Sequence, residues 1–113
     1  IGLLSLHWLG DFVCQTSWMA KNKSDNMFAL GLHVLTYSII FFLALLTPFY
    51  NVTINTAILY VSLNCVVHFI TDLCTSQYTK YYFEKKDMRR FFIVLGLDQL
   101  MHHTILLLSS VML

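Results

Sequence analysis

The chain has 113 residues, of which 58% are hydrophobic and only 12% are charged, and its net charge is +1. Soluble domains carry about 25% charged residues, so this composition argues against a soluble domain and indicates a membrane protein. The basic residues are divided between two loops, which argues against nucleic acid as a partner.

Four apolar runs are each long enough to form a helix that crosses a bilayer, and they cover about 2–20, 27–47, 54–79 and 89–112. The connections are short and polar, and the whole chain has one proline and four glycines. We therefore predict an all-α fold with one integral membrane domain over 1–113. Its architecture would be an up-down-up-down bundle of four transmembrane helices.

All seven basic residues lie in or beside the first and third connections, whereas the connection around Pro48 has none. Cytoplasmic loops of membrane proteins are enriched in Lys and Arg. We therefore expect the first and third connections in the cytoplasm and both termini outside. Membrane lipid is the expected partner of these basic loops.

Polar residues recur at helical spacing inside the first run. In 2–20 they form one stripe, His7, Asp11 and Gln15, which must face the interior of the bundle. Lys21 and Lys23 follow in the first connection, where an anionic headgroup can meet them. The second run holds one ionisable residue, His33.

The last two runs repeat this spacing. Asn64, His68 and Asp72 occupy every fourth position of the third run, and Asp98 and His102 are four apart in the fourth. Residues four apart on a helix lie about 6 Å apart, so an imidazole and a carboxylate can reach one ion. Gln99 and His103 form a stripe beside the last pair.

The depth of these residues predicts a single site. Asp11, Asp72 and Asp98 each lie about 12 to 15 Å from the cytoplasmic end of their helix, and His33 lies near the same level. His7, His68 and His102 lie one turn deeper. The first and third runs point toward the cytoplasm and have His before Asp. The fourth run points the opposite way and has Asp before His.

The buried aspartates must either be protonated or have a cation between them, because no Lys or Arg lies deep in any run. Imidazole and carboxylate suit zinc above all, or manganese or iron, and a bundle core can hold two such ions. The predicted ligands are His7, Asp11, His33, His68, Asp72, Asp98 and His102. Gln15, Asn64, Gln99 and His103 would support these ligands or contact a substrate.

The ordered set of motifs resembles a family of small bacterial and phage membrane proteins, domain of unknown function 3307. The matching residues are His7-Trp-Leu-Gly-Asp11, His33, His68-Phe-Ile-Thr-Asp72 and Asp98-Gln99-Leu-Met-His102. This resemblance implies a multi-pass protein of the bacterial inner membrane and no particular activity. A looser similarity to membrane-bound metal-dependent hydrolases, and through them to zinc-dependent phospholipase C and P1-type nucleases, suggests phosphoester hydrolysis.

Three functions are therefore open. The first is a metal-dependent hydrolase acting on a phosphoester in a lipid or amphiphile, with Asp11, Asp72 and Asp98 as the catalytic carboxylates. The second is a transporter or channel that moves protons or divalent metal past the same residues. The third is a non-catalytic partner in an oligomer or larger membrane assembly.

Overall fold

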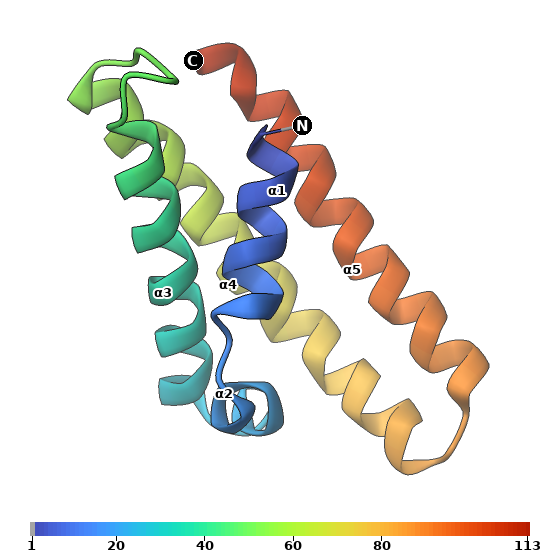
Figure 1. Ribbon diagram of the computed structural model, residues 1–113. Coiled ribbons are helices and arrows are strands. Elements are labelled where there is room, and N and C mark those ends of the chain that lie inside the picture. The colour runs from blue at the N-terminus through green and yellow to red at the C-terminus, as the bar shows by residue number, and fades with distance from the viewer. Residues whose placement is uncertain (1) are drawn as a thin grey trace.

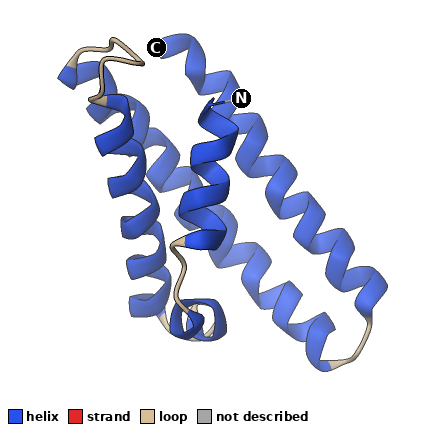
Figure 2. Ribbon diagram, in the orientation of Figure 1, coloured by secondary structure: helices blue, strands red, loops and turns tan. Residues whose placement is uncertain are grey.

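The computed structural model describes residues 2–113, and every regular element in that range is a helix (Figures 1 and 2). The all-α prediction is confirmed. In chain order the elements are α1 (Gly2–Trp8), the π-helix η1 (Leu9–Val13), α2 (Ser17–Asn22), α3 (Met27–Leu45), α4 (Ile54–Glu84), α5 (Met88–Ser109) and the 3₁₀-helix η2 (Ser110–Met112).

Three helices, α3, α4 and α5, are long and apolar enough to cross a membrane. They correspond to the second, third and fourth predicted runs. The third is longer than expected, because α4 continues beyond residue 79 and ends at Glu84. Large apolar side chains such as Phe28, Leu43 and Leu108 are exposed on the outside of these helices, as lipid-facing residues are.

The prediction of one continuous helix over 2–20 is wrong. The seven residues of α1 and the five of η1 extend about 18 Å, well short of the roughly 30 Å of hydrocarbon. The helix stops because Thr16 adopts an extended conformation, and its Oγ1 accepts a hydrogen bond from the backbone N–H of Met19 as the N-cap of α2. The N-terminal segment is therefore a short helix, a break and a second short helix.

The long helices alternate in direction, and α4 packs against both α3 and α5. The α1 helix packs against α3 and α5, and η1 against α3. Figure 1 shows the two termini and the loop between α3 and α4 at one end of the molecule, with α2 and the turn between α4 and α5 at the other. Both basic connections thus share one end. Which side of a membrane that end faces stays a prediction.

An apolar and aromatic core fills the bundle toward the end that holds the termini. Its buried members are Tyr37, Phe41, Leu45, Ala57, Tyr60 and Leu106. The hydroxyl of Tyr60 donates to the Leu106 carbonyl at 3.0 Å, which satisfies the one polar atom of that side chain. Polar interior positions are concentrated on the other side of this core, toward the basic end.

Candidate metal centre

Four buried side chains from three elements converge in the interior. They are Asp11 of η1, His33 of α3, and His68 and Asp72 of α4. His33 Nε2 lies 3.0 Å from Asp11 Oδ1 and 3.2 Å from Asp72 Oδ2. His68 Nε2 lies 3.5 Å from the same Asp11 oxygen, 3.4 Å from the same Asp72 oxygen, and 3.2 Å from His33 Nε2.

These separations suit a tetrahedral metal site. Ligand atoms about 2.0 to 2.1 Å from a zinc ion form a tetrahedron with edges of about 3.3 Å. Five of the six edges between the four facing atoms measure 3.0 to 3.5 Å. Two imidazole nitrogens and two carboxylate oxygens are also a ligand set that zinc, manganese and iron accept. The group can therefore hold a divalent ion.

A second group adjoins the first and consists of Asp72, Asp98 and His102. Asp72 belongs to both, because its Oδ2 faces His33 and His68 while its Oδ1 lies 3.4 Å from His102 Nε2. His102 Nδ1 donates to the Asp98 carbonyl at 2.7 Å, which places the proton on Nδ1. His102 Nε2, which has no hydrogen-bond partner within residues 2–113, is thereby left with a lone pair. A backbone carbonyl that fixes the tautomer in this way is usual behind a metal-binding histidine.

The expectation that the aspartates have no cationic side chain near them is wrong for Asp72. Lys23 Nζ lies 3.4 Å from Asp72 Oδ2. The break after η1 causes this contact, since the chain turns there into the short helix α2, which packs against α3 and ends at its C-cap Lys23. Asp11 and Asp98 have no Lys or Arg within salt-bridge distance among residues 2–113.

Gln99 links the carboxylates to His7. Its side-chain nitrogen donates to Asp11 Oδ2 at 3.0 Å and to Asp98 Oδ2 at 3.1 Å. Its oxygen accepts from His7 Nε2 at 2.8 Å, and His7 Nδ1 then accepts from the Tyr37 hydroxyl at 2.8 Å. Because both His7 nitrogens are engaged, the structure places His7 behind Asp11 and outside both metal groups.

The other predicted residues lie at different distances from the two groups. Asn64 donates to the Tyr60 carbonyl and to Ser109 Oγ, so it belongs to the packed half of the bundle. Gln15 lies in the break, and its buried Oε1 has no partner among the described residues. The His103 ring meets the His7 ring edge to face at 4.7 Å.

Sequence reasoning missed two residues that touch this network. Tyr37 donates to His7, and its ring lies 4.2 Å from the His68 ring. Thr75 Oγ1 donates to Asp98 Oδ1. Helical spacing would have found both, because Tyr37 is four residues after His33 and Thr75 is three after Asp72.

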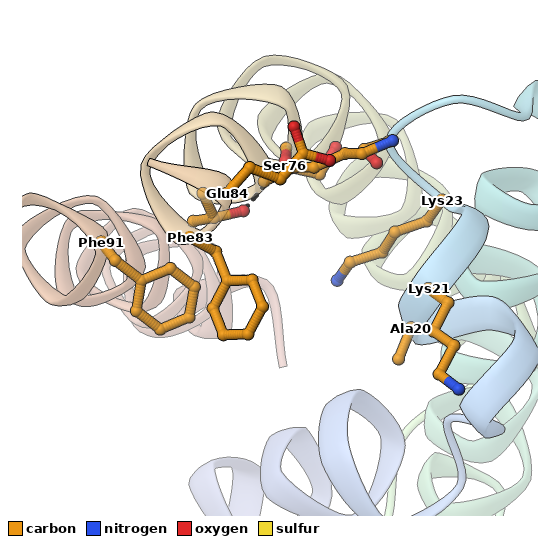
Figure 3. A pocket seen from close by; sticks show the side chains of 10 residues that line it. Ala20, Lys21, Lys23, Ser76, Phe83, Glu84 and Phe91 are labelled. Carbon is orange, nitrogen blue, oxygen red and sulfur yellow. Dashed lines mark hydrogen bonds between the residues drawn. The ribbon is translucent and has the colours of Figure 1, made fainter. Parts of the chain in front are cut away.

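A cleft of about 370 Å³ lies beside the site at the basic end, between α2, α4 and the start of α5 (Figure 3). Lys21 and Lys23 line one side, and Ser76, Phe83 and Phe91 line the other. Lys23 also contacts Asp72, so it joins the cleft to the metal groups.

The fold and the site together define a helical membrane-type protein with two adjoining groups of buried His and Asp side chains that can hold metal ions. The chain belongs to the family described as "Protein of unknown function (DUF3307)", whose model matches residues 1–113. The family resemblance read from the sequence is thus confirmed. No curated protein and no solved structure matches the chain, so the looser similarity to metal-dependent hydrolases stays a prediction.

Proposed function

We propose that this protein is a membrane-embedded, metal-dependent hydrolase that cleaves a phosphoester in a lipid or other amphiphile. Asp11, His33, His68 and Asp72 would hold one ion, preferably zinc, and Asp72, Asp98 and His102 the other. The observation that carries the proposal is the double role of Asp72, whose two oxygens face separate ligand groups. Carboxylates that bridge two ions are typical of bundle-core metal sites.

Bound divalent ions would supply an activated water and stabilise charge on the leaving oxygen. In the hydrolysis the water oxygen would bond to phosphorus, the ester P–O bond would break, and the water's proton would end on the leaving alcohol. Asp98 is the best placed carrier of that proton. Its side chain is 9% exposed, compared with 4% for Asp11 and 2% for Asp72.

The remaining residues of the network would hold these carboxylates in place. Gln99 donates to both Asp11 and Asp98, and Thr75 donates to the second Asp98 oxygen. Such outer contacts fix the orientation of metal ligands and are worth about 10- to 100-fold in affinity or activity. Tyr37 and His7 extend the same chain of hydrogen bonds into the core.

The position of the cleft relative to the apolar core favours a hydrolase over a transporter. A transport path must be wet toward both faces of the membrane. Here the half of the bundle beyond the site is filled by the core of Phe41, Leu45, Tyr60 and Leu106. The cleft opens at the opposite, basic end. We further propose that this end faces the cytoplasm and that the membrane is the bacterial inner membrane.

The test is phosphoester hydrolysis by detergent-purified protein loaded with zinc, manganese or iron. Bis(p-nitrophenyl) phosphate and p-nitrophenyl phosphate serve as soluble substrates, and phospholipid serves as the amphiphile. Asp98→Asn should lose about 10²-fold or more in rate, because Asp98 would both hold the second ion and carry the proton. Asp25→Asn is the matched control, because Asp25 is exposed and pairs with Lys80.

Metal-loaded protein that releases product from none of these substrates would overturn the hydrolase proposal. Proton or metal flux in liposomes would then favour the transporter. Metal that is bound without either activity would favour a non-catalytic partner protein held together by its ions.

A further inference from the structure

The cleft at the basic end has one buried polar atom without a partner. Ser76 lines the cleft, is 6% exposed, and its Oγ bonds to no other described residue. A buried hydroxyl left without a hydrogen bond costs free energy, and a ligand in the cleft could supply the missing hydrogen bond. Ser76 lies one turn after Asp72 on α4, which places the orphan hydroxyl beside the metal groups.

The charge lining the cleft is mainly positive. Lys21, Lys23 and Lys80 line it together with a single carboxylate, Glu84. Lys80 is paired with Asp25, whereas Lys23 reaches inward to Asp72 and keeps 22% of its side chain exposed. Lysine ammonium groups bind phosphate as point charges, so an anionic head is the ligand that this lining favours.

The wall opposite the lysines is aromatic. Phe83 near the end of α4 and Phe91 at the start of α5 lie with ring centroids 5.6 Å apart, and Figure 3 shows both facing α2 across the cleft. A site with cations at one side and aromatic rings at the other suits a molecule with a charged head and an apolar chain. The volume of about 370 Å³ is enough for a headgroup.

We propose that this cleft binds the phosphate headgroup of an anionic amphiphile. The phosphate lies between Lys23 Nζ and Ser76 Oγ, and the chain leaves along Phe83 and Phe91. This inference rests on the proposed function, because it names the class of substrate that would be presented to the centre at Asp72.

Binding is measured on the detergent-purified full chain by isothermal titration calorimetry, in EDTA and again after zinc loading. The probes are dihexanoyl phosphatidic acid, dihexanoyl phosphatidylcholine and inorganic phosphate. In EDTA the phosphatidic acid should bind about tenfold or more tightly than the choline lipid, because its exposed phosphate accepts from Lys23 and Ser76. Equal binding of the two lipids would overturn the proposal.

Single substitutions test whether phosphatidic acid binds in this cleft. Ser76→Ala and Lys21→Gln should each weaken phosphatidic acid binding by about five- to tenfold. Ser62→Ala, an exposed serine on the same helix, and Lys85→Gln, outside the lining, should leave it unchanged. Lys21 is tested in place of Lys23, since a change at Lys23 also disturbs Asp72. Unchanged binding in both cleft variants would place the lipid elsewhere and refute the proposal.

The aromatic wall distinguishes an amphiphile from free phosphate. Phe83→Ala and Phe91→Ala should weaken lipid binding and leave phosphate binding unaltered, and Phe92→Ala, an exposed neighbour, is the control. If inorganic phosphate binds as tightly as the lipid, the apolar chain contributes nothing to binding, and the proposal of an amphiphilic ligand is refuted.

The binding and hydrolysis results can fail separately. If the protein hydrolyses soluble aryl phosphates but does not bind phosphatidic acid selectively, only this inference is refuted. If it binds phosphatidic acid selectively but hydrolyses none of the substrates, this inference is supported and only the proposed function is refuted.

Discussion

The two oxygens of Asp72 face different sets of nitrogen ligands. Oδ2 is within 3.2 to 3.4 Å of His33 and His68, and Oδ1 is 3.4 Å from His102. Lys23 shares the first of these oxygens at 3.4 Å and supplies positive charge there. Asp72 is therefore the residue on which both metal groups depend, and each histidine serves one of them.

This division predicts how zinc stoichiometry responds to single substitutions. The parent should bind about two zinc ions, His102→Ala about one, and Asp72→Asn neither with measurable affinity, because only Asp72 serves both groups. His103→Ala should keep both, since His103 lies outside the groups. Zinc titration of metal-free protein by calorimetry gives these numbers. Two ions in Asp72→Asn would exclude a shared carboxylate.

Two tyrosines of the core have buried, hydrogen-bonded hydroxyls. Tyr37 donates to His7 and Tyr60 to the Leu106 carbonyl. Tyr37→Phe should lower the free energy of unfolding by about 1 to 3 kcal/mol, because His7 Nδ1 is left unpaired. Tyr60→Phe should cost only about 1 kcal/mol, because the Leu106 carbonyl still accepts from Ser109 Oγ. Only Tyr37→Phe should also slow hydrolysis, since its hydrogen bond continues through His7 and Gln99 to the carboxylates. Thermal unfolding and hydrolysis assays on both variants test this. Equal hydrolysis rates in the two variants would show that Tyr37 does not support the site.

Among the elements, the helices that follow simple periodicity were predictable and the N-terminal one was not. Pairs four residues apart placed His68 with Asp72 and Asp98 with His102 on shared faces, as the structure has them. The break at residues 14–16 has no Pro or Gly to announce it, and Thr16 is followed by Met19 where a recognisable capping box has Glu or Gln. Lys23 therefore looked like a surface anchor, although the break turns it toward Asp72.

The π-helix η1 brings Asp11 to His33 by close approach at Gly10. A methyl group there would lie 2.8 Å from Tyr37 Cδ2 and 3.5 Å from Tyr37 Cα. Gly10→Ala should push η1 away from α3, separate Asp11 from His33 and weaken zinc binding by about tenfold or more. Competition with a zinc-sensitive dye measures this affinity.

Gly96→Ala is the matched control for that substitution. A methyl group at Gly96 in α5 meets nothing within 4 Å, and alanine favours a helix over glycine by about 1 kcal/mol. This variant should bind zinc normally and be slightly more stable. Normal zinc affinity in Gly10→Ala as well would show that η1 does not depend on this contact.

At the scale of the whole molecule, the interior has two halves of different character. The half toward the termini is packed with Phe41, Tyr60 and Leu106, and the half toward the basic turns holds the His and Asp groups and the cleft. Depth along the predicted helices was enough to expect one polar layer. The cleft could not be predicted, because it depends on how far α2 lies from the ends of α4 and α5.

The basic residues at one end of the molecule predict its orientation in the membrane. With the basic end in the cytoplasm, Phe49→Cys in the loop between α3 and α4 should react with a membrane-impermeant maleimide in intact spheroplasts. Lys85→Cys in the opposite turn should react only after permeabilisation. Both positions are exposed, and unsubstituted protein measures labelling of Cys14, Cys65 and Cys74. The reverse pattern would contradict the predicted topology.

The central claim is that this bundle holds two metal ions between its His and Asp side chains. Inductively coupled plasma mass spectrometry of detergent-purified protein tests it most directly, beside a His68→Ala, Asp72→Ala double variant and a His103→Ala, Asp25→Asn control. We expect about two equivalents of zinc, manganese or iron in parent and control, and none in a double variant that stays helical and monodisperse. No metal in the parent, even after reconstitution with each ion, would contradict it.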